Sequence, residues 1–325
     1  MISSDNKNVF DKYHFSIGNP DFAYLGDVVR YAGSSIFGYG ATRRLGKSNK
    51  SDAGERGDET LFNESATVID AEEYLISLDY ASLKDSRSRN YFNLAKDVLV
   101  QVLPNINDIR ITDGGGSPAE YFVEFSTPYG WLKPDQLSLG YRTTFSWMID
   151  FVARLIQTYP DSPNPLAEPA VCLIDEIDLH MHPRWQREII DHLARCFPRT
   201  QFIVTAHSPL VVQSAENANI VVLRREGDHV IINNDPVDVR DWRLDQIYTS
   251  ELFGLESARP RRLDTAIKER EDILRKGALT KADRARLEVL NAEILPGAAG
   301  ETRQETETLE LLNRLTNRLK DSAAE

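Results

Sequence analysis

The chain has 325 residues, of which 41% are hydrophobic and 27% are charged, as in an ordinary globular protein with room for one large or two modest domains. Its net charge of −12 argues against a protein coated in nucleic acid, but it leaves open a local basic groove or a partner that supplies DNA contacts. No segment approaches the ~20 apolar residues of a membrane-spanning helix, and the polar N-terminal residues predict no signal peptide.

The first predicted strand covers residues 31–37 and runs into the glycine-rich segment Gly38–Leu45. Glycines permit a tight turn and a close approach of backbone to a ligand. Two interpretations stay open here: a turn with solvent-facing arginines, or a segment beside a nucleotide that includes Tyr39 and Arg43.

Residues 41–48, Ala-Thr-Arg-Arg-Leu-Gly-Lys-Ser, match a relaxed P-loop pattern. A working P-loop needs a helix that starts at the Lys-Ser pair, so that free backbone N–H groups cradle phosphates. The residues after Ser48 are polar and rich in glycine, with no apolar face. We therefore interpret the match as chance.

Two helices are expected within residues 71–102, where apolar residues recur at helical spacing. Strands are expected at 108–112 and 121–126 on either side of a triple glycine. Ser138 and Gly140 then open an apolar helix that includes residues 145–156. Serine is a good N-cap and a helix N-terminus carries partial positive charge, so an ordinary capped helix is one interpretation of this element.

Residues 171–174 are four consecutive apolar residues and predict a fully buried strand of a mostly parallel sheet. Asp175 and Glu176 follow at its carboxyl end, where open α/β sheets bind ligands. In a phosphate site Asp175 would hold Mg²⁺, which prefers oxygen ligands, and Glu176 would take a proton from an attacking water.

His180 and His182 invite interpretation as a metal site, but no cysteine or third nearby ligand completes one, so a structural or cross-subunit role is favoured. Pro183 suits the first turn of a helix that buries Ile189, Ile190, Leu193 and Phe197. A second buried strand, residues 201–204, leads to His207.

Beyond it, a hairpin is expected around Gly227–Asp228, followed by helices at 263–276, 281–294 and 306–319. These last helices form either a solvated appendage or a docking platform for a partner protein. Cys172 and Cys196 make neither a Cys-x-x-Cys motif nor a disulfide framework, which favours a cytoplasmic location.

A Ser-x-Gly helix start, an Asp-Glu strand end and a strand ending in histidine, in this order, resemble the C-terminal half of an ABC-type ATPase. The Leu-His-x-His-Pro run narrows the resemblance to RecF-related AAA family ATPases of bacterial defence modules, such as those of Septu and retron systems. The resemblance covers roughly residues 30 to 320. The fold it implies is α/β, a P-loop NTPase-like ABC ATPase head.

The resemblance also implies roles for single residues. Asp175 would bind Mg²⁺ in the Walker B position, Glu176 would act on the lytic water, and His207 would sense the γ-phosphate. Ser138 and Gly140 would contact ATP held by a second copy, in a head-to-tail dimer. Arg142 either adds charge near the phosphates or lies on the surface. Tyr39 and Arg43 would lie near the nucleotide.

In the resembling family the P-loop precedes the Tyr-Gly-x-x-Arg element, so the N-terminal P-loop part is expected to be missing here. The predicted domains are an ATPase domain over 1–258, with a helical insertion at 70–104, and a C-terminal helical extension over 259–325. The predicted function is Mg²⁺-dependent ATP hydrolysis coupled to a nuclease or toxin effector. Two alternatives stay open: a regulatory or scaffold module that lacks its own P-loop, and a RecF-like DNA-repair ATPase.

Overall fold

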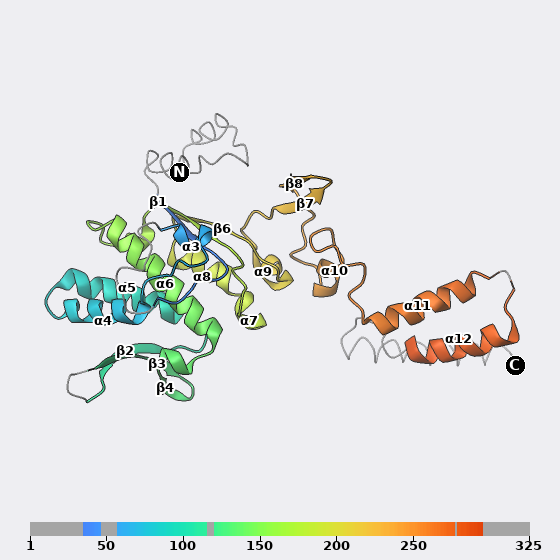
Figure 1. Ribbon diagram of the computed structural model, residues 1–325, viewed down its shortest axis with the longest axis horizontal. Coiled ribbons are helices and arrows are strands. Elements are labelled where there is room, and N and C mark those ends of the chain that lie inside the picture. The colour runs from blue at the N-terminus through green and yellow to red at the C-terminus, as the bar shows by residue number, and fades with distance from the viewer. Residues whose placement is uncertain (1–34, 47–56, 116–119, 277, 295–325) are drawn as a thin grey trace, which may run out of the picture. The chain divides into compact units, whose positions relative to one another are not determined.

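The computed structural model describes residues 35–46, 57–115, 120–276 and 278–294 (Figure 1). The chain divides into two compact units between Asn217 and Ala218. Each unit is described by itself, and the functional boundary expected near residue 258 stays a prediction.

The first unit is built on a parallel sheet of three strands in the order β1-β5-β6. The strands are β1 (Ser35–Tyr39), β5 (Ala170–Ile174) and β6 (Thr200–Val204). Parallel neighbours need long crossover connections, and helices fill both connections here. This arrangement confirms the predicted α/β class with a parallel sheet.

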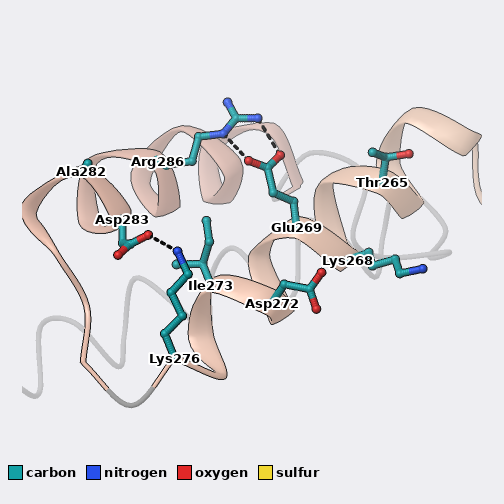
Figure 2. A pocket seen from close by; sticks show the side chains of 9 residues that line it. All are labelled: Thr265, Lys268, Glu269, Asp272, Ile273, Lys276, Ala282, Asp283 and Arg286. Carbon is teal, nitrogen blue, oxygen red and sulfur yellow. Dashed lines mark hydrogen bonds and ion pairs between the residues drawn. The ribbon is translucent and has the colours of Figure 1, made fainter.

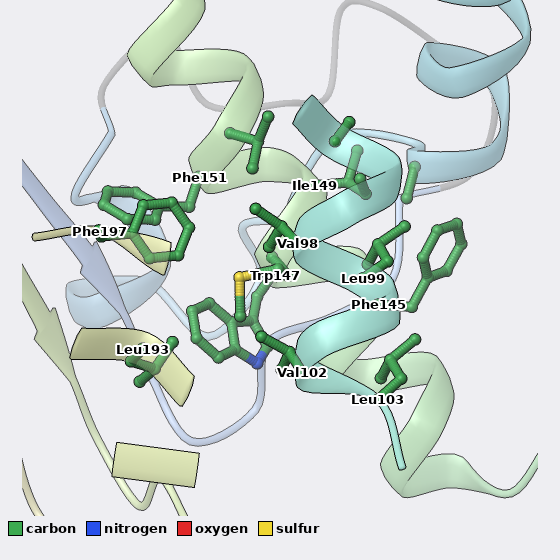
Figure 3. Close-up of a cluster of buried hydrophobic side chains, with 14 of the residues drawn as sticks. Val98, Leu99, Val102, Leu103, Phe145, Trp147, Ile149, Phe151, Leu193 and Phe197 are labelled. Carbon is green, nitrogen blue, oxygen red and sulfur yellow. The ribbon is translucent and has the colours of Figure 1, made fainter. Parts of the chain in front are cut away.

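Helix α6 (Leu139–Thr158) forms the centre of the core. On one side its aromatic rings meet the sheet: Phe151 lies 5.4 Å from Phe37, and Trp147 lies 5.5 Å from Tyr39, between ring centroids. On its other side α6 contacts helix α5 (Ser86–Val102). Figure 3 shows the resulting cluster, which includes Val98, Leu99, Val102, Leu103, Phe145, Trp147, Ile149, Phe151, Leu193 and Phe197. Burial of these apolar surfaces is the main stabilising term for the unit.

The carboxyl group of Asp150 lies inside this core. Asp150 of α6 is 1% exposed and accepts hydrogen bonds from the Tyr39 hydroxyl at 2.8 Å, the Arg154 guanidinium at 2.6 Å and the Ile69 backbone N–H at 3.0 Å. A buried carboxylate is tolerated only when its oxygens are satisfied in this way. Asp150 thereby ties α6 to β1.

Helices and a second sheet lie between β1 and β5 in the chain. A short helix α3 (Glu59–Phe62) precedes α4 (Ala71–Ser82) and α5, which begin after capping aspartates, Asp70 and Asp85. An antiparallel sheet follows, with strands β2 (Asp108–Asp113), β3 (Tyr121–Thr127) and β4 (Gly130–Leu132). The two helices and the first two strands of this region confirm the prediction.

Two sequence predictions are wrong in detail. Neither predicted buried strand is fully buried: Val171 and Leu173 of β5 are partly exposed, and Ile203 of β6 is 51% exposed in the described part of the chain. The helix predicted after Pro183 is two helices, α7 (Pro183–Gln186) and α8 (Ile189–Cys196), and each buries its own apolar residues. Helix α9 (Pro209–Ser214) then closes the unit.

The second unit contains the hairpin β7 (Val222–Glu226) and β8 (His229–Asn233), the short helix α10 (Leu244–Tyr248), and the helix pair α11 (Arg261–Leu274) and α12 (Lys281–Ile294). The hairpin and the helix pair confirm the prediction, whereas the helix expected at 306–319 lies outside the described residues. Among the helices that the structure describes, none has the length and apolar character to cross a membrane.

Candidate functional site

The carboxyl ends of β5 and β6 meet at one edge of the sheet and carry the predicted acidic pair and histidine. Asp175 and Glu176 directly follow β5, and His207 follows β6 after two further residues. His207 Nε2 lies 3.9 Å from Glu176 Oε1. The His207 side chain is 82% exposed and that of Glu176 is 35% exposed, so both are accessible to a ligand. Parallel strands put their carboxyl ends at the same edge, which is why these residues converge.

Thr205 joins the two strand ends. Its hydroxyl donates to Asp175 Oδ1 at 2.6 Å and accepts the Glu176 backbone N–H at 2.8 Å. Glu176 has φ +49°, a left-handed conformation that a non-glycine residue adopts only when its surroundings hold it there. Sequence reasoning missed Thr205, although its place directly after the strand and two residues before His207 is a signal that could have found it.

Arg43 lies behind the acidic pair. Its guanidinium, on a residue only 3% exposed, donates to the backbone carbonyls of Asp175 at 2.6 Å, Glu176 at 2.5 Å and Gly40 at 3.1 Å. Burial lowers the pKa of Arg43 to about 10, and the nearby carboxylate of Asp175 opposes this shift. Arg43 therefore braces the backbone of Asp175 and Glu176 from inside the protein.

Tyr39 reaches the same strand ends through its backbone. Its carbonyl accepts the Asp175 backbone N–H at 2.8 Å. Its side chain points into the core, where the hydroxyl donates to Asp150 and burial raises the tyrosine pKa well above its ordinary value. Any contact of Tyr39 with a ligand at the strand ends would therefore involve its main chain.

The loop after Glu176, residues 178–182, packs against both His207 and α6. The Asp178 carboxylate accepts the His207 backbone N–H, at 3.2 and 3.3 Å to its two oxygens. His182 caps α7 by accepting the Arg184 backbone N–H at its Nδ1, at 3.2 Å. Over the described residues, no group of three or more His, Cys, Asp or Glu side chains is arranged to hold a metal by itself.

Ser138, Gly140 and Arg142 lie at the start of α6. A Cβ atom on Gly140 would come within 2.2 Å of the His180 carbonyl oxygen, so only glycine fits where α6 meets the loop. Ser138 occupies the N-cap position and is exposed, but its side chain makes no capping hydrogen bond. Arg142 lines a cavity of about 150 Å³ with Asp70, Glu72 and Asp135.

The structure thus brings Asp175, Glu176, His207 and Arg43 together. Among the contacts of the described residues, none joins Ser138 or Arg142 to the strand-end group. Asp175 and Glu176 offer oxygen atoms of the kind that Mg²⁺ prefers, and no ion pair between Asp175 and a cationic side chain is present in the described part of the chain. This donor set fits a Mg²⁺ ion that is completed by phosphate and water oxygens.

Comparison with known proteins gives matches of three kinds: a family, similar proteins and solved structures. Residues 37–213 match the family described as "AAA domain, putative AbiEii toxin, Type IV TA system". The chain is 29% identical over 249 residues to "Septu protein PtuA" of Bacillus mycoides (strain KBAB4), a match over 75% of this chain and 32% of that protein. It is 36% identical over 129 residues to "Retron Ec83 probable ATPase" of Escherichia coli, covering 40% of this chain and 23% of that protein.

The chain therefore spans a third or less of the length of these two relatives. A solved structure from work described as "Structural biochemistry of ATP-driven dimerization and DNA stimulated activation of SMC ATPases" is a distant match. It is 15% identical with a TM-score of 0.35, over 50% of this chain and 88% of that chain.

The family match covers more than half of the chain and includes the end of β1 and the whole of α6, β5 and β6, with the residues that follow them. The Septu and retron relatives agree with the resemblance to defence-module ATPases that the sequence motifs predict. The chain belongs to the family "AAA domain, putative AbiEii toxin, Type IV TA system".

Proposed function

We propose that this protein binds ATP with Mg²⁺ and hydrolyses it at the strand-end group of Asp175, Glu176 and His207. The observation that carries the proposal is the 3.9 Å approach of His207 to Glu176 beside the Thr205-bound carboxylate of Asp175. Asp175 would hold Mg²⁺, which when bound neutralises phosphate charge. Glu176 would orient and deprotonate the lytic water, and His207 would donate to the γ-phosphate.

The proposal includes a composite site in a head-to-tail homodimer. Ser138 is exposed at the N-terminus of a 20-residue helix, where backbone N–H groups and the helix dipole favour an anion. With no described contact between Ser138 and the strand-end group of the same chain, we assign Ser138, Gly140 and Arg142 to ATP held by the partner copy. A closed two-fold pair has two such sites.

We further propose that hydrolysis gates a nuclease or toxin effector in anti-phage defence, in the cytoplasm. The names of the Septu and retron relatives support the defence role, and two free cysteines support the location. Contact with DNA is not part of the proposal, since a net charge of −12 favours a partner as the DNA-binding component.

An ATPase assay of the purified chain tests the proposal. Glu176→Gln should lower kcat by about a hundredfold or more, because it removes the base, and should leave the Kd for ATP within about threefold. Withholding Mg²⁺ should abolish hydrolysis. Glu216→Gln changes an exposed glutamate after α9 and serves as the matched control. Equal turnover by Glu176→Gln and the wild-type protein would eliminate Glu176 as the base.

A further inference from the structure

Gln186, the last residue of α7, forms side-chain hydrogen bonds with two loops outside its own helix. Its side-chain Nε2 donates to the Asp178 carbonyl at 3.3 Å and to the Met181 carbonyl at 3.1 Å. Its Oε1 accepts the Ser208 hydroxyl at 2.8 Å. Only an amide supplies donors at one end and an acceptor at the other, so the contacts fix both the residue type and its orientation.

These bonds close a ring around the candidate site. The Asp178 carboxylate accepts the His207 N–H, His207 precedes Ser208 in the chain, and Ser208 binds Gln186, which returns to the Asp178 carbonyl. The Ser208 hydroxyl also accepts the Leu210 backbone N–H at 3.2 Å and so caps α9. Opening the ring at Gln186 would leave the hydrogen bonds of the His207 N–H to the Asp178 carboxylate as the direct link between the 178–182 loop and the segment that carries His207.

The ring extends to the start of α6. His180 lies in the same loop at φ +62°, and its carbonyl oxygen occupies the space where a side chain on Gly140 would be. A shift of the 178–182 loop therefore changes the packing at Gly140, two residues from Ser138. The position of His207 and the start of α6 are thus connected through contacts that pass through Gln186.

We propose that Gln186 is a positioning residue that holds His207 and the 178–182 loop in register with the N-terminus of α6. The inference rests on the proposed function, because it assigns His207 to the phosphate and Ser138 to the partner's nucleotide. Gln186 itself touches no reacting atom. Its effect on turnover is exerted through His207 and the loop, whose displacement by less than an ångström affects alignment for phosphoryl transfer.

Two variants of the full chain test the assignment. Gln186→Glu keeps the shape and an acceptor for Ser208, but it places a carboxylate against two carbonyls. Gln186→Met removes every hydrogen bond at similar length. Gln201→Glu, an exposed glutamine on β6, makes the same change of charge outside the ring and serves as the control.

The first readout is hydrogen exchange of single amides in the nucleotide-free protein. Both Gln186 variants should speed exchange at Met181 and His207 by about tenfold or more, with Cys172 in β5 unchanged. Unchanged exchange at Met181 and His207 would overturn the proposal. Equal acceleration at Cys172 would also overturn it, since that pattern means general loss of stability.

The second readout is turnover. The Gln186 variants should lower kcat by about tenfold with the Kd for ATP within about threefold, while Gln201→Glu matches the wild-type protein. Full kcat alongside accelerated local exchange would overturn the proposed link to catalysis. If the wild-type chain hydrolyses no ATP, the proposed function fails, and the exchange data still decide whether Gln186 positions the two loops.

Discussion

Glu176 is the residue on which the proposed chemistry depends, and its backbone is held in a conformation that is unfavourable by itself. At φ +49° it needs external restraint. Arg43 binds its carbonyl from the core side, and the Thr205 hydroxyl accepts its N–H from the β6 side. Two side chains, from the segments that follow β1 and β6, therefore hold the backbone of the proposed base.

Replacement of Thr205 tests this restraint. Thr205→Val should lower the free energy of unfolding by about 1–2 kcal/mol, because it removes one hydrogen bond to a carboxylate and one from a backbone N–H. It should also lower kcat, since Glu176 and Asp175 lose a shared anchor. Urea unfolding and an ATPase assay measure the two effects.

Thr205→Ser keeps the hydroxyl and is the matched control, expected to stay close to the wild-type protein in both measurements. A Val variant with normal turnover and normal stability would show that the hydroxyl does not hold the acidic pair in solution.

At this scale a run of apolar residues ending in polar ones identified each of the two strand ends, and the resemblance to ABC-type ATPases joined Asp175, Glu176 and His207 into one predicted site. The sequence could not predict the role of Thr205, which depends on the register between β5 and β6. It placed Arg43 near the site, but it did not predict that the Arg43 guanidinium donates hydrogen bonds to backbone carbonyls. That orientation depends on the core position of Arg43, whose guanidinium carbon lies 5.8 Å from the centre of the Trp147 ring.

At the scale of elements, long segments with clear periodicity were predictable, whereas the short helices α3 and α10 were not. Helices α4, α5 and α6 each extend over three or more turns of repeated apolar positions. The break between α7 and α8 was missed, because Ile189 and Leu193 continue a helical spacing from Trp185. At Gln186, where α7 ends, the side chain makes a tertiary contact: it donates hydrogen bonds to the backbone carbonyls of a loop.

The helix pair α11–α12 is held by ion pairs around a small apolar core. Figure 2 shows Arg286 paired with Glu269 and Lys276 with Asp283, over a groove that these residues line. A hydrogen bond from the Lys276 ammonium is the largest cause that holds the pKa of the Asp283 carboxyl below its usual range, and hydrogen bonds from Thr280 are the next largest. A hydrogen bond from Arg286 likewise lowers the pKa of the Glu269 carboxyl. Four apolar residues, Leu263, Ala266, Ile273 and Leu290, are buried within the described part of this pair.

Acid should therefore loosen this helix pair. Because both carboxyl pKa values are lower in the folded state, their stabilising contribution is present above the unfolded value of about 4 and is lost as the pH falls through the folded values. We expect hydrogen-exchange protection of α12, corrected for the intrinsic rate, to fall between pH 6 and about 2.5.

The double variant Glu269→Gln, Asp283→Asn lacks both titrating groups and is the control. Its α12 should be less protected at pH 6 and should lose less protection in acid. An equal loss in the variant and the wild-type protein would assign the acid effect to other groups.

At the scale of the whole molecule, the family match and the candidate site both fall in the first unit, within residues 37–213. Within one chain, Gly140 at the start of α6 packs against the 178–182 loop, which follows the strand-end group. Ser138, two residues before Gly140, is exposed. This division predicts that a complete site needs two copies, each giving a different part.

Mixing two inactive variants tests that prediction most directly. Ser138→Tyr should block the donated surface, and Glu176→Gln should remove the base, so each alone should be nearly inactive. Random pairing of equal amounts makes half of the dimers mixed, and each mixed dimer has one intact composite site of two. The ATPase activity of the mixture should therefore reach about a quarter of the wild-type value. A mixture no more active than the two variants measured separately would contradict a site shared between copies.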